Sequence, residues 1–348
     1  MKIKFIFSLF VILNCFVFQT TNATESTKTT EEKKLPKICM IFDRAGKDDH
    51  SFNESAYNGF KTAQKNHLIS DDSRIFEAKD DGQIQQATRS FAAANCDLIF
   101  GIGVNVAEPI KKLVNKYPKQ KFVMVDYVVP GNNVQSIIYR EDQAGFLIGA
   151  IAAMKSKTHK IGIIAGMDIP LVERFRLGYE AGAHYIEPKT KVITSFVGVS
   201  VDGWNNPTKA EEIALSQFNQ DVDIIFQASG GSGIGVFNAA EKLDANGKQK
   251  KHFAIGCDSN QNWIKPGIIL TSMIKSLDES VLNTIKDFRE NKFISGTVVY
   301  GIENKGVDWA YDKYNKDLFT SSDILKINSI KSGIASGKIT VPDYYKIR

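Results

Sequence analysis

The chain has 348 residues, of which 43% are hydrophobic and 24% are charged, and its formal net charge is +5. A charge excess this small, without a basic run interleaved with aromatic residues, excludes a typical nucleic-acid-binding protein. The length exceeds the size at which one hydrophobic core stops growing, so we expect more than one lobe.

The N-terminus has the three parts of a secretory signal peptide, which we place over residues 1–23. Two lysines precede the apolar run from Phe5 to Phe18, and small or polar residues follow as far as Ala23. The run is shorter than the roughly 20 residues of a transmembrane helix, so we expect cleavage after Ala23 and export to the periplasm. The alternative is acylation at Cys15, because ILNC partly resembles the cleavage signature of bacterial lipoproteins.

A polar stretch without large apolar side chains follows, and we expect a flexible linker over residues 24–35. Three further cysteines, Cys39, Cys96 and Cys257, lie in or beside apolar, strand-like runs. Three thiols cannot all pair, and we interpret them as buried free thiols. The five histidines lack the spacing of metal ligands, so neither a metal nor a cofactor is expected.

Apolar runs of strand length then alternate with segments of helical period, which is typical of parallel sheets with crossover helices. The first series predicts strands over 37–42, 74–79, 97–102, 121–126 and 134–140, with helices over 53–66, 83–94 and 106–116. A long apolar helix is predicted over 143–156.

A second series repeats the pattern, so two similar α/β lobes are expected rather than one. It predicts strands over 160–166, 191–198, 223–228 and 252–258, with helices over 172–185, over 207–218 and after the glycines of 230–235. The remainder is too short for a third lobe and is expected to complete the other two. It predicts strands over 267–276 and 296–302 and helices over 278–290 and near 322–336.

The glycine-rich loop at the end of one strand raises the question of a bound cofactor. Gly231, Gly233 and Gly235 alternate, and Val236 stands where the third glycine of a dinucleotide fingerprint belongs. No Gly-Lys-Ser/Thr sequence follows, which excludes a P-loop. The loop therefore indicates either close approach of a neutral ligand to bare backbone or tight packing of a strand on a helix.

Ligands of open parallel sheets bind at the carboxyl ends of the strands, where this chain places many carboxylates. Asp126 and Asp258 each end an apolar strand, and a carboxylate can accept hydrogen bonds from two vicinal sugar hydroxyls. Either aspartate could instead cap the following turn. The same carboxylates would repel a phosphate, which favours a nucleoside or a sugar over a nucleotide.

Two aromatic residues and one cation stand in unusual places. Phe52 just precedes a helix, as a packing contact or as an exposed platform, and Trp204 lies in a polar loop. Flat rings of this kind can sandwich a nucleobase or another planar group. Lys275 is a cation within an apolar strand, either paired in a site or extending from a sheet edge to solvent.

Seven segments then occur in an order far more specific than any one of them: GKDDHSFNESAYNGF, VMVDYVV, YREDQAGFLIGAIAAM, IIFQASGGSGIGVFNAAEK, IGCDSNQ, LTSMIKSLDESV and VYGIENKGVDWA. This order resembles the basic membrane protein family of periplasmic or lipid-anchored substrate-binding proteins, which are similar to purine nucleoside receptors of ABC importers. The resemblance covers almost all of residues 36–311.

The resemblance implies a type I periplasmic-binding-protein fold. Two doubly wound parallel-sheet lobes are joined by a three-segment hinge, with a nucleoside buried between them. We place lobe 1 over 36–140 plus about 259–300, and lobe 2 over 141–258 plus about 301–348.

The resemblance also assigns site residues. Phe52 is expected to stack on the base, with Trp204 opposite, and Asp126, Asp258 and Lys275 to contact the ribose. The other residues assigned to the base, to the sugar or to the loop beside it are Asp43, Ser51, Asn53, Gly230 and Gly231.

Three functions remain open. The first is a monomeric, extracytoplasmic substrate-binding protein that closes on a purine nucleoside and presents it to the permease and ATPase subunits of an ABC transporter. The second is the same fold binding a sugar or another planar metabolite. The third is a nucleoside-acting enzyme, which the lack of a nucleophile with a partner base disfavours.

Overall fold

The computed structural model describes Met1, residues 34–245 and residues 251–346. The expected signal peptide, the alternative acylation at Cys15 and the linker up to residue 33 lie outside these described residues. Leu35–Arg348 forms one compact unit. Within the described part of that unit, no helix combines the length and the apolar composition needed to cross a membrane.

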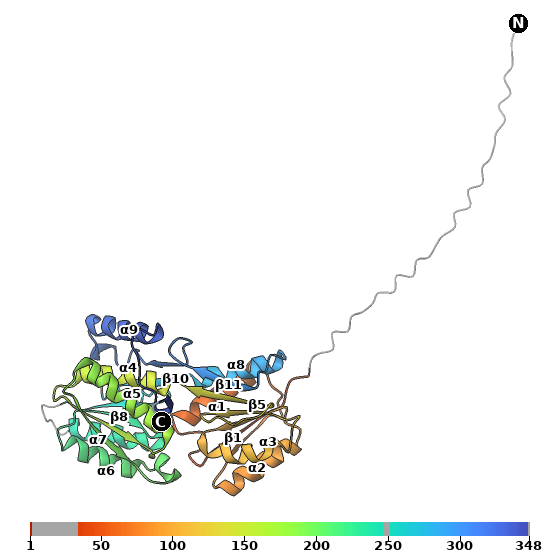
Figure 1. Cartoon of the computed structure of the whole chain (residues 1–348), viewed down its shortest axis with the longest axis horizontal. Helices are drawn as coiled ribbons and strands as arrows, with labels where there is room; N and C mark the ends of the chain where they lie inside the picture. Colours follow the sequence, from red (N-terminus) through yellow and green to blue (C-terminus); the bar gives the residue numbers. More distant parts are fainter. Residues whose placement is uncertain (2–33, 246–250, 347–348) are drawn as a thin grey trace. The chain divides into compact units, whose positions relative to one another are not determined.

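The first lobe is a six-stranded sheet with helices on both faces (Figure 1). Its strands stand in the order β11-β5-β4-β3-β1-β2, and every neighbouring pair is parallel. The elements of this lobe are β1 (Ile38–Phe42), α1 (Phe52–Lys65), β2 (Arg74–Glu77), α2 (Asp81–Ala93), β3 (Leu98–Ile102), η1 (Val104–Val106), α3 (Ala107–Val114), β4 (Lys121–Val125), β5 (Val134–Tyr139), α8 (Leu277–Arg289) and β11 (Gly296–Tyr300).

The second lobe has the same architecture, with strand order β12-β10-β9-β8-β6-β7, and only β12 runs antiparallel to its neighbour. Its elements are α4 (Glu141–Lys155), β6 (Lys160–Ala165), α5 (Pro170–Ile186), β7 (Lys191–Phe196), η2 (Val201–Trp204), α6 (Pro207–Phe218), β8 (Ile224–Ala228), η3 (Gly230–Ser232), α7 (Gly233–Ala245), β9 (Phe253–Gly256), β10 (Ile269–Lys275), β12 (Val307–Trp309), η4 (Lys316–Leu318), α9 (Ser321–Ala335) and η5 (Tyr344–Lys346). The predicted strands and helices are confirmed to within a few residues at their ends, whereas the three-residue β12 has no sequence signal.

The central strands are continuous apolar runs because helices cover both faces of each sheet. Every residue of β1 and β3 is buried. Side chains alternate along β1, so Cys39 and Ile41 join the core with α2 and α3, while Met40 and Phe42 join the core with α1 and α8. Figure 1 shows α2 and α3 together on one side of this sheet and α8 on the other.

The chain passes between the lobes three times, after β5, after β10 and after β11. We expected residues from about 259 to about 300 in the first lobe, but β10 pairs with β9 and β12 in the second sheet. The second crossing therefore follows Lys275, and α8 is the element that returns to pack against α1. The composition of a buried apolar strand does not indicate which of two similar sheets it joins. The sequence alone therefore misplaces the boundary between the lobes at β10.

The expectation of free thiols is wrong for two of the three cysteines. Cys39, on β1, and Cys96, just before β3, form a disulfide with their Cα atoms 6.0 Å apart, and Cys257 remains free and buried. The two strands are direct neighbours in the sheet, with Cys39 opposite Ile99. This pairing across 57 residues depends on strand order, which spacing along the chain does not reveal.

Breaking this disulfide will lower the free energy of unfolding by about 2–4 kcal/mol, because the cross-link restricts the unfolded chain. Urea unfolding with and without a thiol reductant measures the change. The double variant Cys39→Ser/Cys96→Ser should not respond to the reductant. An equal response there would assign the effect to another group.

Candidate functional site

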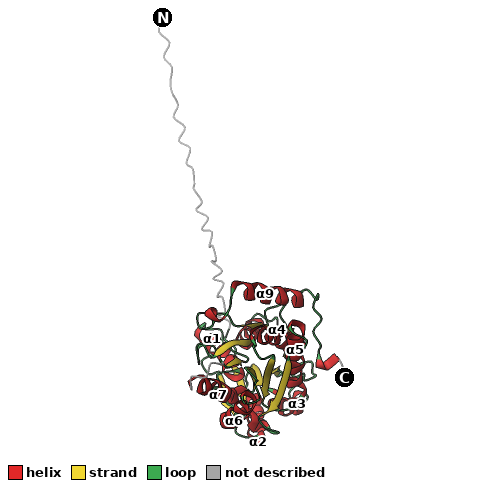
Figure 2. Ribbon diagram, turned by 90° about the vertical axis from the view of Figure 1, so that its left-hand side faces the viewer, coloured by secondary structure: helices red, strands yellow, loops and turns green. Residues whose placement is uncertain are grey.

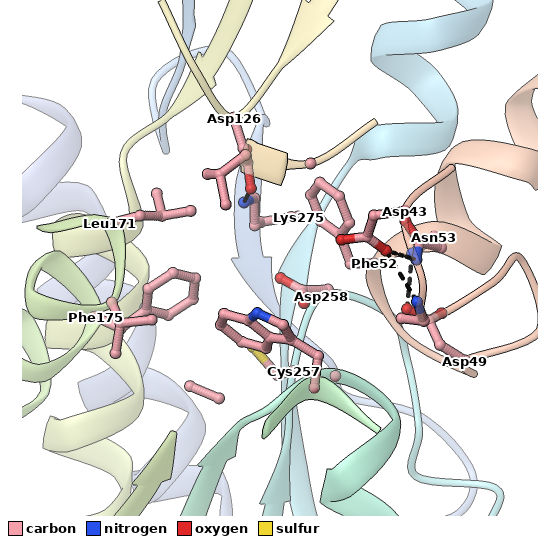
Figure 3. A pocket seen from close by; sticks show the side chains of 17 residues that line it. Asp43, Asp49, Phe52, Asn53, Asp126, Leu171, Phe175, Cys257, Asp258 and Lys275 are labelled. Atoms are coloured by element: carbon pink, nitrogen blue, oxygen red, sulfur yellow. Dashed lines mark hydrogen bonds and ion pairs between the residues drawn. The ribbon is translucent and has the colours of Figure 1, made fainter. Parts of the chain in front are cut away.

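A cavity with about 630 Å³ of empty space lies where the carboxyl ends of the strands of both lobes meet. Figure 3 shows side chains of both lobes pointing toward one another across it. The first lobe contributes Asp43, Ala45, Asp49, Phe52, Asn53, Gly103, Val104 and Asp126. The second lobe contributes Leu171, Val172, Phe175, Trp204, Ala228, Gly230, Cys257, Asp258 and Lys275.

Two aspartates, one from each lobe, follow equivalent strands. Asp126 follows β4 and Asp258 follows β9, and both have φ of 66°, which is uncommon for a residue other than glycine. Among the described residues, Oδ1 of each is buried without a hydrogen-bond partner. An unpaired buried oxygen costs free energy unless a ligand supplies a donor, so each aspartate offers one acceptor to the cavity.

Lys275, at the end of β10, is the cation between these carboxylates, and its side chain is 1% exposed. Its Nζ lies 2.6 Å from Asp126 Oδ2 and 3.1 Å from Glu141 Oε1. Burial alone would lower the pKa of Lys275, but Asp126, Glu141 and Asp258 together raise it above its ordinary value. Lys275 is therefore a fixed positive charge whose position is set from both lobes.

Aromatic rings surround the same ammonium group. The Nζ of Lys275 lies 5.1 Å from the ring centre of Phe52, 4.8 Å from that of Tyr139 and 5.7 Å from that of Phe175. Such distances allow cation–π attraction, which is strongest where water is excluded. In Figure 3 Phe175 and Leu171 form one wall, with Phe52 on the opposite side.

Ser51, which the family resemblance assigns to the site, lies behind the cavity wall rather than in it. Its hydroxyl donates to the carbonyl oxygen of Cys257 at 3.0 Å or to Asp258 Oδ2 at 3.2 Å. Burial raises the pKa of Asp258, and Lys275 and this hydroxyl oppose that shift. Ser51 thus holds Asp258 across the boundary between the lobes.

Both carboxylate oxygens of Asp43 already accept hydrogen bonds from within the protein. Its Oδ1 accepts from Asn53 Nδ2 at 3.2 Å and from the Ala45 amide at 3.2 Å, and its Oδ2 accepts from Asn105 Nδ2 at 3.1 Å. Burial raises its pKa, against these hydrogen bonds. The amide oxygen of Asn53 is buried without a partner among the described residues, so it is the free acceptor at this end of the cavity.

Asp49 caps α1 and also lines the cavity. It accepts from the backbone amides of Ser51, Asn53 and Glu54 at 2.9–3.0 Å. Burial raises its pKa to about 6, while those amides oppose the shift. Asp49 was not among the predicted site residues, and its signal in the sequence is an acid two positions before the serine that precedes the helix.

Asp49 should make stability depend on pH. Its pKa in the folded state exceeds its unfolded value, so its contribution is most favourable below about pH 4 and is lost as the pH rises through about 6. We expect wild type to lose on the order of 2 kcal/mol relative to Asp49→Asn between pH 4 and pH 7. Urea midpoints of both proteins across this range measure the difference. A difference that does not change with pH would contradict the assignment.

Trp204 and the glycine loop form the floor on the side of the second lobe. The indole packs against the backbone of Gly166, where a Cβ atom would overlap the ring. Gly230 has a φ of +57° and lines the cavity, whereas Gly231 lies behind it, next to the backbone of Trp204. The Ser232 hydroxyl donates to the carbonyl oxygen of Gly203 at 2.8 Å, which ties the loop to η2.

The structure therefore brings eight of the ten sequence-predicted residues to one cavity, and places Ser51 and Gly231 just behind it. The cavity residues that were not predicted from the sequence are Ala45, Asp49, Gly103, Val104, Leu171, Val172, Phe175, Ala228 and Cys257. Most follow strand ends, so their position in the chain was the available signal. The sequence gave no signal for the α5 residues Leu171, Val172 and Phe175. The period of a crossover helix does not show which of its residues contact the other lobe.

Comparison with known proteins agrees with this geometry. The family described as Bmp, ABC transporter substrate-binding protein PnrA-like, matches residues 37–344. The ABC transporter nucleoside-binding protein BmpA of Lactococcus lactis subsp. cremoris (strain MG1363) is 29% identical over 320 residues, covering 88% of this chain and 89% of its own. Basic membrane protein A of Borreliella burgdorferi (strain ATCC 35210 / DSM 4680 / CIP 102532 / B31) is 28% identical, covering 96% and 94%.

A solved structure shows the same fold. It is an ABC transporter solute-binding protein from Aeropyrum pernix K1, with a TM-score of 0.80 and 24% identity, covering 90% of this chain and 96% of that one. The two-lobed architecture, the cavity between the lobes and the match over residues 37–344 lead to one conclusion. The chain belongs to the Bmp family of PnrA-like ABC transporter substrate-binding proteins.

Proposed function

We propose that this protein binds a purine nucleoside in the cavity between its lobes. The observation that carries the proposal is one cavity with aromatic rings on opposite sides and unpaired carboxylate oxygens at its end. Phe52 comes from the first lobe, and Trp204 and Phe175 come from the second. Flat rings on both sides suit a planar base, which they desolvate by stacking.

The sugar would occupy the end with Asp126, Asp258 and Lys275. Two vicinal hydroxyls can donate to the free Oδ1 atoms of the two aspartates, and the ammonium group can donate to a hydroxyl oxygen. Asn53 Oδ1, toward the other end, would accept an N–H of the base. The four aspartates that line the cavity outnumber its one lysine, so a phosphate group would be repelled.

The role of the protein follows from its family. Substrate-binding proteins of ABC transporters deliver small ligands to membrane-bound permease and ATPase subunits, and we propose that role, outside the cytoplasm, for this chain. The Cys39–Cys96 disulfide supports export, because such bonds persist in oxidising compartments. The name of the Lactococcus lactis relative, a nucleoside-binding protein, supports the ligand class. We propose no catalytic role for the cavity, because the family that matches this chain consists of substrate-binding proteins.

Calorimetric titration of the purified protein, refolded from denaturant to remove any carried ligand, tests the proposal. We expect inosine, guanosine or adenosine to bind, uridine to bind more weakly, and ribose more weakly still. Phe52→Ala should weaken binding at least tenfold through lost stacking, whereas Phe293→Ala, a partly buried ring outside the cavity, should not. Silence with every nucleoside from a folded protein, or tighter binding of a free sugar, would contradict a nucleoside receptor.

A further inference from the structure

Arg174 is a buried cation beside the cavity that the proposed ligand does not touch. It lies on α5, between the wall residues Val172 and Phe175, and its side chain is 3% exposed. Nη1 donates to Glu141 Oε2 at 2.6 Å, and Nη2 donates to Asp142 Oδ1 at 3.0 Å. Nη1 also donates to the Tyr139 carbonyl oxygen. The guanidinium group thus binds the segment that passes from β5 in the first lobe to α4 in the second.

The remaining side of this guanidinium group contacts residues near the C-terminus. Nε donates to Asp343 Oδ1 at 3.1 Å, and Asp343 is 8% exposed. The ring centre of Tyr345 lies 4.9 Å from Cζ of Arg174, within the range of cation–π attraction. The η5 turn that carries Tyr345 packs against α5, and Figure 2 shows it beside that helix.

Glu141 joins this cluster to the cavity, and its side chain is 1% exposed. Its Oε2 binds Arg174, and its Oε1 lies 3.1 Å from Nζ of Lys275. Buried charges therefore run without interruption from Asp126 through Lys275, Glu141 and Arg174 to Asp343. In a low-dielectric interior each charge fixes the position of the next, so a change at one end is felt at the other.

We propose that Arg174 is a positioning residue for the ligand site, and that the C-terminal segment of residues 342–346 is the clasp that holds it. The clasp acts in two ways. It fixes the α5 wall that carries Phe175, and through Glu141 it fixes the ammonium group of Lys275. The inference rests on the proposed ligand site, although no residue of the clasp lines that cavity.

Affinity for inosine tests the clasp. Asp343→Asn keeps the shape of the side chain and removes its charge, and we expect binding about tenfold weaker. A chain that ends at Val341 should lose at least as much. Asp317→Asn, the same change at an exposed acid of η4, is the matched control and should leave affinity within twofold. Equal affinities of wild type and Asp343→Asn would overturn the proposal.

A double-mutant cycle separates positioning from simple stabilisation. If Asp343 acts through Arg174 on Glu141, then Asp343→Asn and Glu141→Gln together should weaken binding by less than the product of their separate effects. If the clasp were purely structural, the two substitutions would weaken binding independently, and the loss in the double variant would equal the product of the separate losses. That result would contradict the positioning role.

Amide hydrogen exchange of the ligand-free protein keeps this test distinct from that of the proposed function. Asp343→Asn should speed exchange in the first two turns of α5 and at the start of α4, but not in α6. If wild type bound no nucleoside while this pattern appeared, the clasp would stand and the nucleoside assignment would fall. Unchanged exchange in α5 would overturn the clasp whatever the ligand.

Discussion

Replacing Lys275 with methionine will lower the free energy of unfolding by about 3–5 kcal/mol and will abolish measurable ligand binding. Methionine fills a similar volume, so the loss comes from charge rather than from a cavity. Asp126 would stay buried without its cation, and Glu141 would keep only Arg174 of its two cations. Removing one partner of a buried ion pair costs far more than the pair itself contributes.

The loss in Lys275→Met should shrink in acid. Burial raises the pKa of both Asp126 and Glu141, and Lys275 opposes that shift. Without Lys275 their pKa values rise further, so both groups take up protons at a higher pH and lose the negative charge that Lys275 had neutralised. Their folded pKa values lie above the unfolded ones, so the destabilisation is complete at neutral pH and declines as the pH falls through the raised values.

Urea unfolding at pH 7 and pH 5 measures both parts of this prediction. Lys331→Met is the matched control, because Lys331 pairs with Asp308 at a partly exposed site and such pairs contribute at most about 1 kcal/mol. Equal losses in the two variants, or a loss in Lys275→Met that does not depend on pH, would mean that the carboxylates are not buried as described.

The sequence predicted most of the fold because two local features identify its strands. Runs such as Ile38–Phe42 are apolar throughout, and a helical period follows each of them. Both features report burial, which is a local consequence of the layered architecture. The end of each strand, and therefore the position of Asp126 and Asp258, follows from the same pattern.

What the sequence could not show depends on contacts between distant segments. The Cys39–Cys96 disulfide and the place of β10 are set by the order of strands in the sheets. Phe175 reaches the cavity because α5 packs against α4 through glycines such as Gly149, whose Cβ would overlap the backbone of Tyr179. Pairings of this kind leave no local periodicity.

The role of Arg174 illustrates the same limit. Its four partners come from β5, from the start of α4 and from the C-terminal segment. In the sequence it is one basic residue in an amphipathic helix, where solvent exposure is the usual outcome. Only the fold shows that it shares Glu141 with Lys275, so the sequence pointed to eight residues that line the cavity but not to the charges behind it.

Asp258→Asn will weaken binding of a purine nucleoside about 100-fold, provided that the proposed ligand is correct. The carboxylate offers a free Oδ1 to the cavity and accepts a hydrogen bond from the Ser51 hydroxyl on Oδ2. The amide of asparagine must instead turn its NH₂ group either toward the ligand or toward Ser51. A hydrogen bond to a charged group contributes about 1.5–3 kcal/mol, and an unsatisfied buried group adds to the loss. Calorimetry at pH 7 measures the ratio, with the exposed acid variant Asp202→Asn as control.

The pH dependence of binding provides an independent check on Asp258. Burial raises its pKa, so the ionised form that accepts sugar hydroxyls is lost as the pH falls through that raised value. Wild-type affinity should therefore decline in acid, and Asp258→Asn should decline less. A 100-fold loss that is the same at every pH would show that the amide disturbs packing, whereas a loss that shrinks toward acid would show that the negative charge of Asp258 binds the sugar.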